Sequence, residues 1–354
     1  MKFVFHVVNQ GLRSLVLGGG RLAALTIALS VSSAPAIVAD TIVFNDGRRS
    51  DDCKIESAQW DQVRYTVGNG GAQTAPSERI ESIFRTPRGA GLASGRRALD
   101  RGRYNAAIKA LAQSGSVDWE VAETAYLLAK AHEAKGDRKT AEANYKKYVS
   151  KHQAEKDWWI PHALYNLGLL QLSGKKAKAA DQTFAKLDEF GGNWSARAKL
   201  GLARGVVLAK NRGQYLEQAQ SLGTLTRNTR APAALRAEAY VIRARIFVLG
   251  RQYDRAIDEL RRTFFNPPNS RNNIYSHARA DATLAIGLAY LASGGKKNLE
   301  QAEIWLLRVP ALYRNEGRVY REACDALSRV YEGLGNNARS QEWEKRAGDE
   351  GNSP

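Results

Sequence analysis

Apolar residues recur along most of the chain at intervals of three and four positions, and residues 164–187 show this pattern most clearly. Their apolar or small residues form two sets separated by Ser173-Gly174: Leu164, Leu167, Gly168 and Leu172, then Ala177, Ala180, Phe184 and Leu187. Each set lies on one face of a helix, so the segment is expected to be a helical hairpin. A single hairpin cannot bury both faces, and it therefore requires copies of itself on either side.

Six further segments repeat the pattern, which predicts an α-solenoid of about seven hairpins over residues 92–348, followed by a disordered tail at 349–354. The marker residues of the other hairpins are Ala98, Gly102, Tyr104 and Leu111; Leu128, Gly136, Ala141 and Tyr145; Gly205, Gly213, Tyr215 and Leu222; Ala244, Phe247, Tyr253 and Leu260; Ile286, Tyr290, Ala302 and Leu306; and Leu327, Tyr331, Gly335 and Trp343.

Residues 40–86 follow a different pattern, in which apolar and polar residues alternate. Strands are expected at 41–44, 53–57, 62–67 and 79–84, with turns at Asp46-Gly47 and at residues 68–71. An open sheet of this size would leave unprotected edges, so the pattern predicts a small closed β-barrel. Pro and Gly at residues 87–91 indicate a linker to the helices.

The barrel segment resembles the small SH3-like or Sm-like β-modules that precede helical repeats in some secreted bacterial proteins. The resemblance is carried by TIVFNDGR at 41–48, VRYTV at 63–67 and RIESIF at 79–84. Sm-like modules elsewhere bind RNA, but an acidic module on an exported chain argues against that function here.

Residues 1–39 are expected to be a secretory signal peptide. Lys2, Arg13 and Arg21 make a positive leader, and an apolar core of about ten residues follows at 22–31. This core is shorter than the roughly 20 residues of a membrane span. Cleavage is expected before Asp40 or near Ala36, with an uncleaved anchor as the alternative. The protein is therefore expected in the periplasm or outside the cell, and the bacterial cell envelope is the provisional location.

The formal charge of +17 is unevenly distributed. The leader contributes three positive charges, and residues 40–84 carry eight acids and five bases, so residues 85–354 hold a net excess equal to that of the whole chain. Such an excess favours solubility, or an acidic protein, nucleic acid or anionic envelope polymer as a partner.

The hairpins resemble the tetratricopeptide repeat, in which a small residue on the first helix is followed by a Gly-x-Tyr turn and an alanine on the second helix. The family period is about 34 residues; Gly95 and Ala129 keep it, whereas later spacings are longer. The resemblance implies a right-handed solenoid whose first helices line a concave face and bind protein or peptide partners there.

Candidate partner-binding residues follow from the positions of the first helices: Tyr126, Lys130, Tyr165, Asn166, Lys199 and Arg245. Some members of the family clamp a carboxylate terminus at such positions. Asn166 and Lys199 match that clamp, whereas Lys130 and Ala203 replace an expected asparagine and arginine. The alternative is that the tyrosines pack within the array. Similarly, Trp158-Trp159 is expected either to seat the third hairpin or to form an exposed contact.

The sequence offers no recognisable catalytic, cofactor or metal motif. His132, His152, His162 and His277 lack metal-ligand spacing, and Cys53 and Cys324 lie far apart, so whether they pair is open. The expected function is a non-enzymatic scaffold of the bacterial cell envelope without a cofactor. The alternatives are a basic array that binds an anionic polymer or nucleic acid, and an accessory factor in envelope assembly or secretion.

Overall fold

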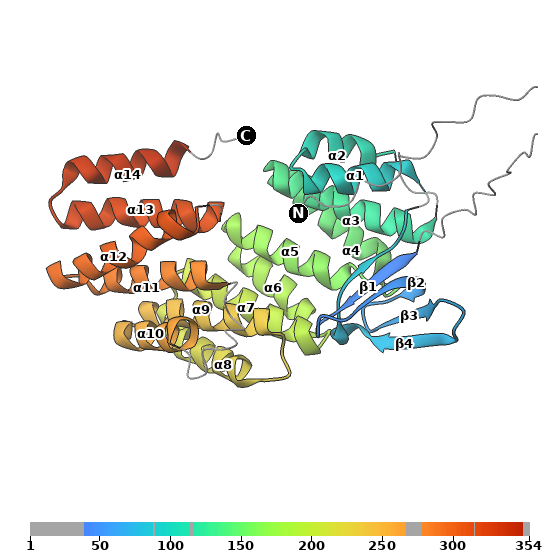
Figure 1. Ribbon diagram of the computed structural model, residues 1–354, viewed down its shortest axis with the longest axis horizontal. Coiled ribbons are helices and arrows are strands. Elements are labelled where there is room, and N and C mark those ends of the chain that lie inside the picture. Colours follow the sequence, from blue (N-terminus) through green and yellow to red (C-terminus); the bar gives the residue numbers. More distant parts are fainter. Residues whose placement is uncertain (1–38, 88, 114–116, 267–277, 315, 350–354) are drawn as a thin grey trace, which may run out of the picture. The chain divides into compact units, whose positions relative to one another are not determined.

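The computed structural model describes residues 39–87, 89–113, 117–266, 278–314 and 316–349, which belong to one compact unit. The predicted leader lies outside these residues, apart from Ala39. The described part contains a five-stranded antiparallel sheet followed by fourteen α-helices, as Figure 1 shows.

The sheet has the strand order β4-β3-β2-β1-β5. The strands are β1 (Asp40–Phe44), β2 (Arg49–Ala58), β3 (Gln62–Val67), β4 (Ala72–Pro76) and β5 (Ile80–Phe84). Four of them fall where alternation predicted strands, and β4 is an addition. The outer strands β4 and β5 each pair with one neighbour in the sheet, so the prediction of a closed barrel was wrong.

The sheet does not need to close, because side chains from outside it complete its core. Trp158, which follows the fourth helix, is buried with Ile42, Val63 and Ile83 of the strands. The outer strand β4 is five residues long and ends at Pro76. Short outer strands and proline both limit pairing with another chain. The argument from unprotected edges overlooked these two ways of protecting an open sheet.

The helices of the described residues form seven helical hairpins, which confirms the predicted array. The pairs are α1 (Ala90–Asp100) with α2 (Tyr104–Leu111), α3 (Asp118–Lys135) with α4 (Arg138–His152), α5 (Ile160–Ser173) with α6 (Ala177–Asp188), α7 (Gly192–Leu208) with α8 (Tyr215–Arg227), α9 (Ala233–Leu249) with α10 (Tyr253–Leu260), α11 (Arg279–Ser293) with α12 (Lys296–Leu312), and α13 (Gly317–Gly333) with α14 (Asn337–Asp349).

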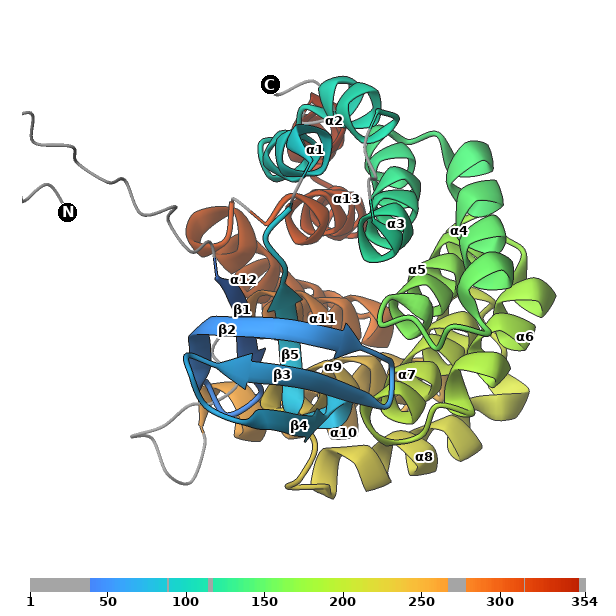
Figure 2. The same cartoon turned by 90° about the vertical axis from the view of Figure 1, so that its right-hand side faces the viewer.

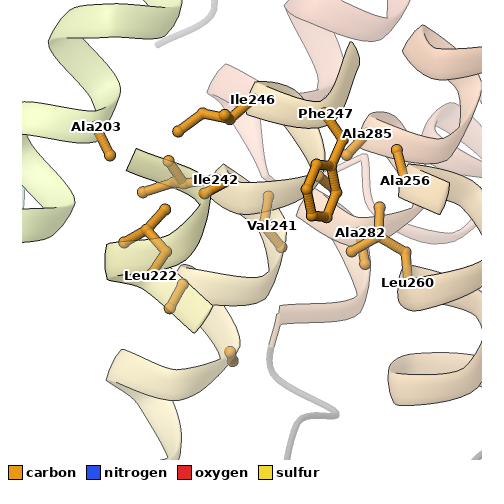
Figure 3. Close-up of a cluster of buried hydrophobic side chains, with 14 of the residues drawn as sticks. Ala203, Leu222, Val241, Ile242, Ile246, Phe247, Ala256, Leu260, Ala282 and Ala285 are labelled. Carbon is orange, nitrogen blue, oxygen red and sulfur yellow. The ribbon is translucent and has the colours of Figure 1, made fainter. Parts of the chain in front are cut away.

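Contacts between the pairs follow a regular order. The second helix of each hairpin packs against the first helix of the next, and the first helices of most consecutive hairpins also contact one another. Figure 3 shows the central core built in this way: Phe247 of α9 lies among Ala256 and Leu260 of α10 and Ala282 and Ala285 of α11. The hairpins thus bury their apolar faces against neighbours, as the sequence pattern requires.

Glycine allows the closest approach between helices in the array. Phe184 of α6 is fully buried between Gly168 of α5 and Gly201 of α7. A Cβ atom would lie 2.5 Å from the Phe184 ring at Gly168 and 2.3 Å from it at Gly201. Leu111 meets Gly95, and Leu306 meets Gly287, in the same way. These glycines are required because any larger residue would overlap a buried side chain.

The sheet is attached to the array near α5 and α7, as Figure 2 shows. Gln59 forms an isolated bridge with Asp157, and the Trp60 amide donates to the carbonyl of Lys156 at 3.0 Å. The ring of Trp60 meets Phe190 edge-on at 4.8 Å between centroids. The adjacent Trp158 and Trp159 pack between elements. Trp158 lies in the core of the sheet, and the ring of Trp159 stacks on that of Tyr126 with 4.8 Å between centroids.

Substitution of Gly201 by alanine is expected to destabilise the protein by about 1–3 kcal/mol, because the added methyl group overlaps a buried ring that cannot rotate away. Urea unfolding followed by circular dichroism measures this change. The control is Gly317→Ala, where nothing lies within 4 Å of the new Cβ and the stability should stay the same or rise slightly. Equal stability of the two variants would contradict the proposed packing role.

Candidate functional site: a groove along the first helices

A groove with a volume of about 600 Å³ runs along the first helices of the central and C-terminal hairpins. Helices α5, α7, α9, α11 and α13 all contribute to it. Its lining residues are Leu169, Leu172, Ser173, Arg204, Val207, Leu208, Ala234, Glu238, Val241, Ile242, Arg245, Ala278, Asp281 and Arg318.

The surface of the groove is mainly apolar, with side chains from three helices. Leu169 and Leu172 come from α5, Val207 and Leu208 from α7, and Val241 from α9. Leu208 is 64% exposed, although a leucine gains most free energy when it is buried. Concave apolar surface with a few polar groups is typical of binding sites in proteins.

The charged residues of the groove form ion pairs with one another. Arg204 of α7 contacts Glu238 of α9 at 2.6 Å, and Arg245 of α9 contacts Glu322 of α13 at 3.0 Å. Arg318 of α13 pairs with Asp281 of α11 and, at 3.4 Å, with Glu322. Each of the three lining arginines is therefore paired with a carboxylate. Glu238 and Asp281 also line the groove, whereas Glu322 does not.

Two contacts made by groove residues, an ion pair and a hydrogen bond, link hairpins that are not consecutive. Arg245 and Glu322 join α9 to α13, and the Tyr165 hydroxyl of α5 donates to Glu238 of α9 at 3.4 Å. Burial and the nearby Glu238 carboxylate raise the pKa of Tyr165 above its ordinary value, so the hydroxyl keeps the proton that it donates. Both contacts bypass the intervening first helix and thus hold the inner side of the array.

The groove includes one of the six residues proposed from sequence, Arg245, and it is bordered by a second, Tyr165, through Glu238. Three others gather elsewhere. Asn166 donates to the hydroxyl of Tyr126 at 3.2 Å, and the Lys130 ammonium lies 5.8 Å from the centre of the same ring. Tyr126 is buried between Trp159 and the tyrosines of α4, so it is a packing residue.

Lys199 is exposed on α7 but does not line the groove. Helical geometry places it about 140° around the helix from Arg204, which does line the groove. Since the Asn166 amide is bonded to Tyr126 and Lys199 is on another face, the two residues that match a carboxylate clamp are not combined in this groove.

Sequence analysis missed Arg204, Glu238, Asp281, Arg318 and Glu322. The ion-pair partners are separated by 34 residues for Arg204 and Glu238 and by 77 for Arg245 and Glu322, and such distances exceed local spacing rules. Position within the helix gives no signal either, because Arg204 lies twelve residues after the start of α7 and Glu238 lies five residues after the start of α9.

The described residues contain neither a cluster that could hold a metal ion nor a helix that could span a membrane. No group of three or more His, Cys, Asp or Glu side chains within them could hold a metal ion. Cys53 and Cys324 are both buried, and no disulfide joins them. Among the same residues, no helix is long and apolar enough to cross a membrane.

Comparisons with known proteins yield remote similarities of fold. No protein-family model matches the chain, and no curated protein is similar to it in sequence. A solved tetratricopeptide repeat protein from Parabacteroides merdae is 18% identical, with 66% of this chain and 96% of that chain covered and a TM-score of 0.37. The complex of the TPR2AB domain of yeast Sti1 with pHSP90 is 15% identical, with 68% and 96% covered and a TM-score of 0.28.

Replacing Glu322 by glutamine is expected to cost about 1 kcal/mol of stability, because it removes the carboxylate that pairs with Arg245 and leaves Arg318 with Asp281 alone. The side chains of Arg245 and Glu322 are only 23% and 34% exposed, whereas those of Arg346 and Glu342 are 48% and 52% exposed. The matched control Glu342→Gln should therefore change the unfolding free energy by less than about 0.5 kcal/mol. Urea titrations at low salt test both values. An equal loss of unfolding free energy in the two variants would show that the ion pair at the groove contributes no more than an exposed surface pair.

Proposed function

We propose that the protein is a non-enzymatic interaction scaffold that binds a peptide segment of a partner protein in the groove along the first helices. The observation that carries this proposal is the exposed apolar surface formed by Leu208 and its neighbours and framed by ion pairs. A helical array holds such a surface in one shape, so the partner loses little binding free energy to ordering of the scaffold.

The groove selects for apolar side chains rather than for charge. Its arginines are already paired with Glu238, Asp281 and Glu322, and a strongly acidic ligand would have to compete with these carboxylates. The partner segment is therefore expected to insert apolar residues between the ion pairs and to place its polar residues at the margins. Nearly all of the positive excess of residues 85–354 lies outside the groove.

Binding of an anionic polymer is the second candidate, and the structure weakens the argument for it. The fifth hairpin is rich in arginine, but Arg243 pairs with Glu259 at 3.2 Å and Arg245 with Glu322. Arg255 lies over the Phe247 ring at 4.2 Å. These three arginines thus already take part in contacts within the protein. A steep loss of affinity with salt would instead favour the polymer.

The location that we propose is the cell envelope, after export through the leader at residues 1–39. The support comes from sequence, namely a positive start and an apolar core of about ten residues. A scaffold in that compartment could also serve as an accessory factor in envelope assembly or secretion, and identification of the partner would distinguish the two roles.

Export is tested by fusing the full chain to alkaline phosphatase, an enzyme that folds only in oxidising compartments. Phosphatase activity and an N-terminus at Asp40 or near residue 37 are expected. The variant Leu25→Arg places a charge in the apolar core and should abolish activity. The matched control Leu312→Arg makes the same change at an exposed residue that is distant from the leader in sequence. Full activity of the Leu25 variant would refute the proposed signal.

Peptide binding is tested by selecting peptides from a displayed random library and then measuring their affinity by calorimetry. Substituting serine for Leu208 should weaken a groove-binding peptide at least about tenfold, because the peptide loses a central apolar contact. Little loss of stability is expected, since Leu208 is already 64% exposed.

The control for peptide binding is Leu216→Ser, which makes the same change at an exposed leucine of α8 outside the groove and should leave affinity unchanged. If the two variants bind the selected peptides equally well, the groove is not the peptide site.

A further inference from the structure

The turns inside the helical hairpins lie together along one edge of the array. Each turn joins the end of a first helix to the start of a second helix, so all of these turns lie at the same end of the hairpins. Residues near consecutive turns contact one another, namely Arg138 with Ser173, Leu172 with Gly205, and Tyr215 with Gly250. The turns of the second to fifth hairpins therefore form one surface, which we call the turn edge.

The turn edge carries an excess of exposed positive charge. Within two residues of its four turns there are nine bases and two acids, Asp137 and Asp254, which gives a net charge of +7. The nine bases, all exposed, are Lys135, Arg138, Lys139, Lys175, Lys176, Lys178, Lys210, Arg212 and Arg251. Within the described residues, only Lys176 of these nine forms an ion pair, with Glu142 at 2.6 Å. The arginines that line the groove, in contrast, are all paired.

Three of these bases occupy a backbone conformation that favours glycine. Lys175, Lys210 and Arg251 have φ angles of 59°, 52° and 59°. The equivalent residue of the second hairpin is Gly136, with a φ angle of 89°, and at all four positions the amide donates to the carbonyl three residues earlier. A side chain in this left-handed conformation costs free energy that glycine does not. Three consecutive turns nevertheless place a base there.

Lys156 shows what offsets such a cost elsewhere in the chain. It too has a positive φ angle, of 53°, but its ammonium group contacts Asp61 at 3.3 Å and lies 5.7 Å from the centre of the Trp60 ring. Within the described residues, the three left-handed bases of the turn edge form no ion pair that could act in the same way. Strained residues of this kind are typical of functional surfaces, which indicates a partner outside the protein.

The fourth turn adds apolar side chains to the charge. Leu208 and Leu216 flank it and are 64% and 53% exposed. Side chains of a helix lean toward its N-terminus, so Leu216, the second residue of α8, leans toward the turn edge. Exposed leucine beside several bases is typical of proteins that lie on a membrane, where the apolar group enters the head-group region and the bases meet anionic lipids.

Single-stranded nucleic acid fits the turn edge less well. Such ligands stack their bases on aromatic side chains that alternate with positive charge. Within two residues of the four turns, the aromatic residues are Tyr215 and Tyr253, and both are partly buried. A soluble polyanion, in turn, gains nothing from the exposed Leu216. The combination of bases and leucine therefore favours a membrane surface.

The sheet lies at the opposite end of the hairpins. Gln59 bridges to Asp157, and the ring of Trp60 meets that of Phe190, in loops that join one hairpin to the next. Residues 40–84 have eight acids and five bases. The protein thus has an acidic end and a basic end, so an anionic surface attracts the turn edge and repels the sheet.

From these observations we propose that the turn edge docks the protein onto the surface of an anionic phospholipid membrane. The bases of the four turns lie against the lipid phosphates, and Leu216 enters the head-group region. The sheet then faces away from the membrane. This surface is distinct from the groove apart from Leu208, which belongs to both, so the proposal does not depend on peptide binding.

The test is co-sedimentation of the purified full chain with vesicles. Vesicles of about 30% phosphatidylglycerol in phosphatidylcholine should bind the protein at least about tenfold more strongly than pure phosphatidylcholine at about 50 mM salt. The preference should decrease at about 300 mM salt, because salt screens the attraction. Equal binding to the two kinds of vesicle would overturn the proposal.

A triple variant locates the surface without straining the fold. Asparagine tolerates the left-handed conformation better than lysine or arginine does, so the combined changes Lys175→Asn, Lys210→Asn and Arg251→Asn should leave the melting temperature unchanged or higher. Binding to the anionic vesicles should decrease about a hundredfold, because each base near such a surface contributes about fivefold.

The matched control removes the same charges from the other end of the second helices. It combines Lys151→Asn, Lys186→Asn and Arg227→Asn, all at exposed positions. Its vesicle binding should decrease less than about threefold, because these positions lie away from the membrane. Both triple variants keep residues 1–39, so any contribution of the leader is the same in each. Equal losses in the two triple variants would overturn the assignment of the turn edge.

A change at Leu216 separates a membrane from a soluble polyanion. Leu216→Ser should weaken vesicle binding about fivefold by removing an inserted apolar group, whereas Leu312→Ser, at a leucine that is 68% exposed on α12, should not. Duplex DNA and polyglutamate serve as soluble polyanions. Stronger binding to either of them than to the vesicles, or unchanged vesicle binding by the Leu216 variant, would overturn the membrane as the partner.

Discussion

Packing of a large side chain from one helix onto a glycine of another helix sets the spacing on which the rest of this array depends. Phe184 occupies the space that side chains at Gly168 and Gly201 would otherwise fill, and Leu111 and Leu306 meet their own glycines in the same way. Close spacing of α5 and α7 places their inner faces side by side. The apolar groove and its bordering ion pairs are consequences of that approach, since arginine and glutamate can bridge successive first helices only at short range.

The fold was largely predictable because local patterns determine it. Three- and four-residue periodicity identified the helical hairpins, and alternation identified four of the five strands. The closed barrel was wrong for a reason that periodicity does not contain: Trp158, about 75 residues beyond the last strand, completes the sheet core. A hydrophobic core that borrows a residue from another segment cannot be recognised from the pattern of either segment alone.

Functional residues were harder to predict than helices. Arg245 was identified from its position on a first helix, but the same reasoning selected Tyr126, whose ring is buried, and Lys199, which lies on another face of α7. Position along a helix specifies a face only when the direction of the neighbouring helices is known. A second pocket, between the sheet and the helices, is lined by six segments of the chain, from Asn45 to Leu235, and a sequence pattern provides no information about such an encounter.

The contacts that bypass a helix have a consequence for how the protein folds. In a simple repeat array each hairpin interacts only with its neighbours, so folding can begin at any hairpin and unfolding can stop between two of them. Here Tyr165 and Glu238 connect the third hairpin to the fifth, and Arg245 and Glu322 connect the fifth to the seventh. Such longer-range coupling raises cooperativity, because loss of one hairpin also removes contacts from hairpins two positions away. The part of the array that carries the groove is thereby favoured to fold, and to persist, as one unit.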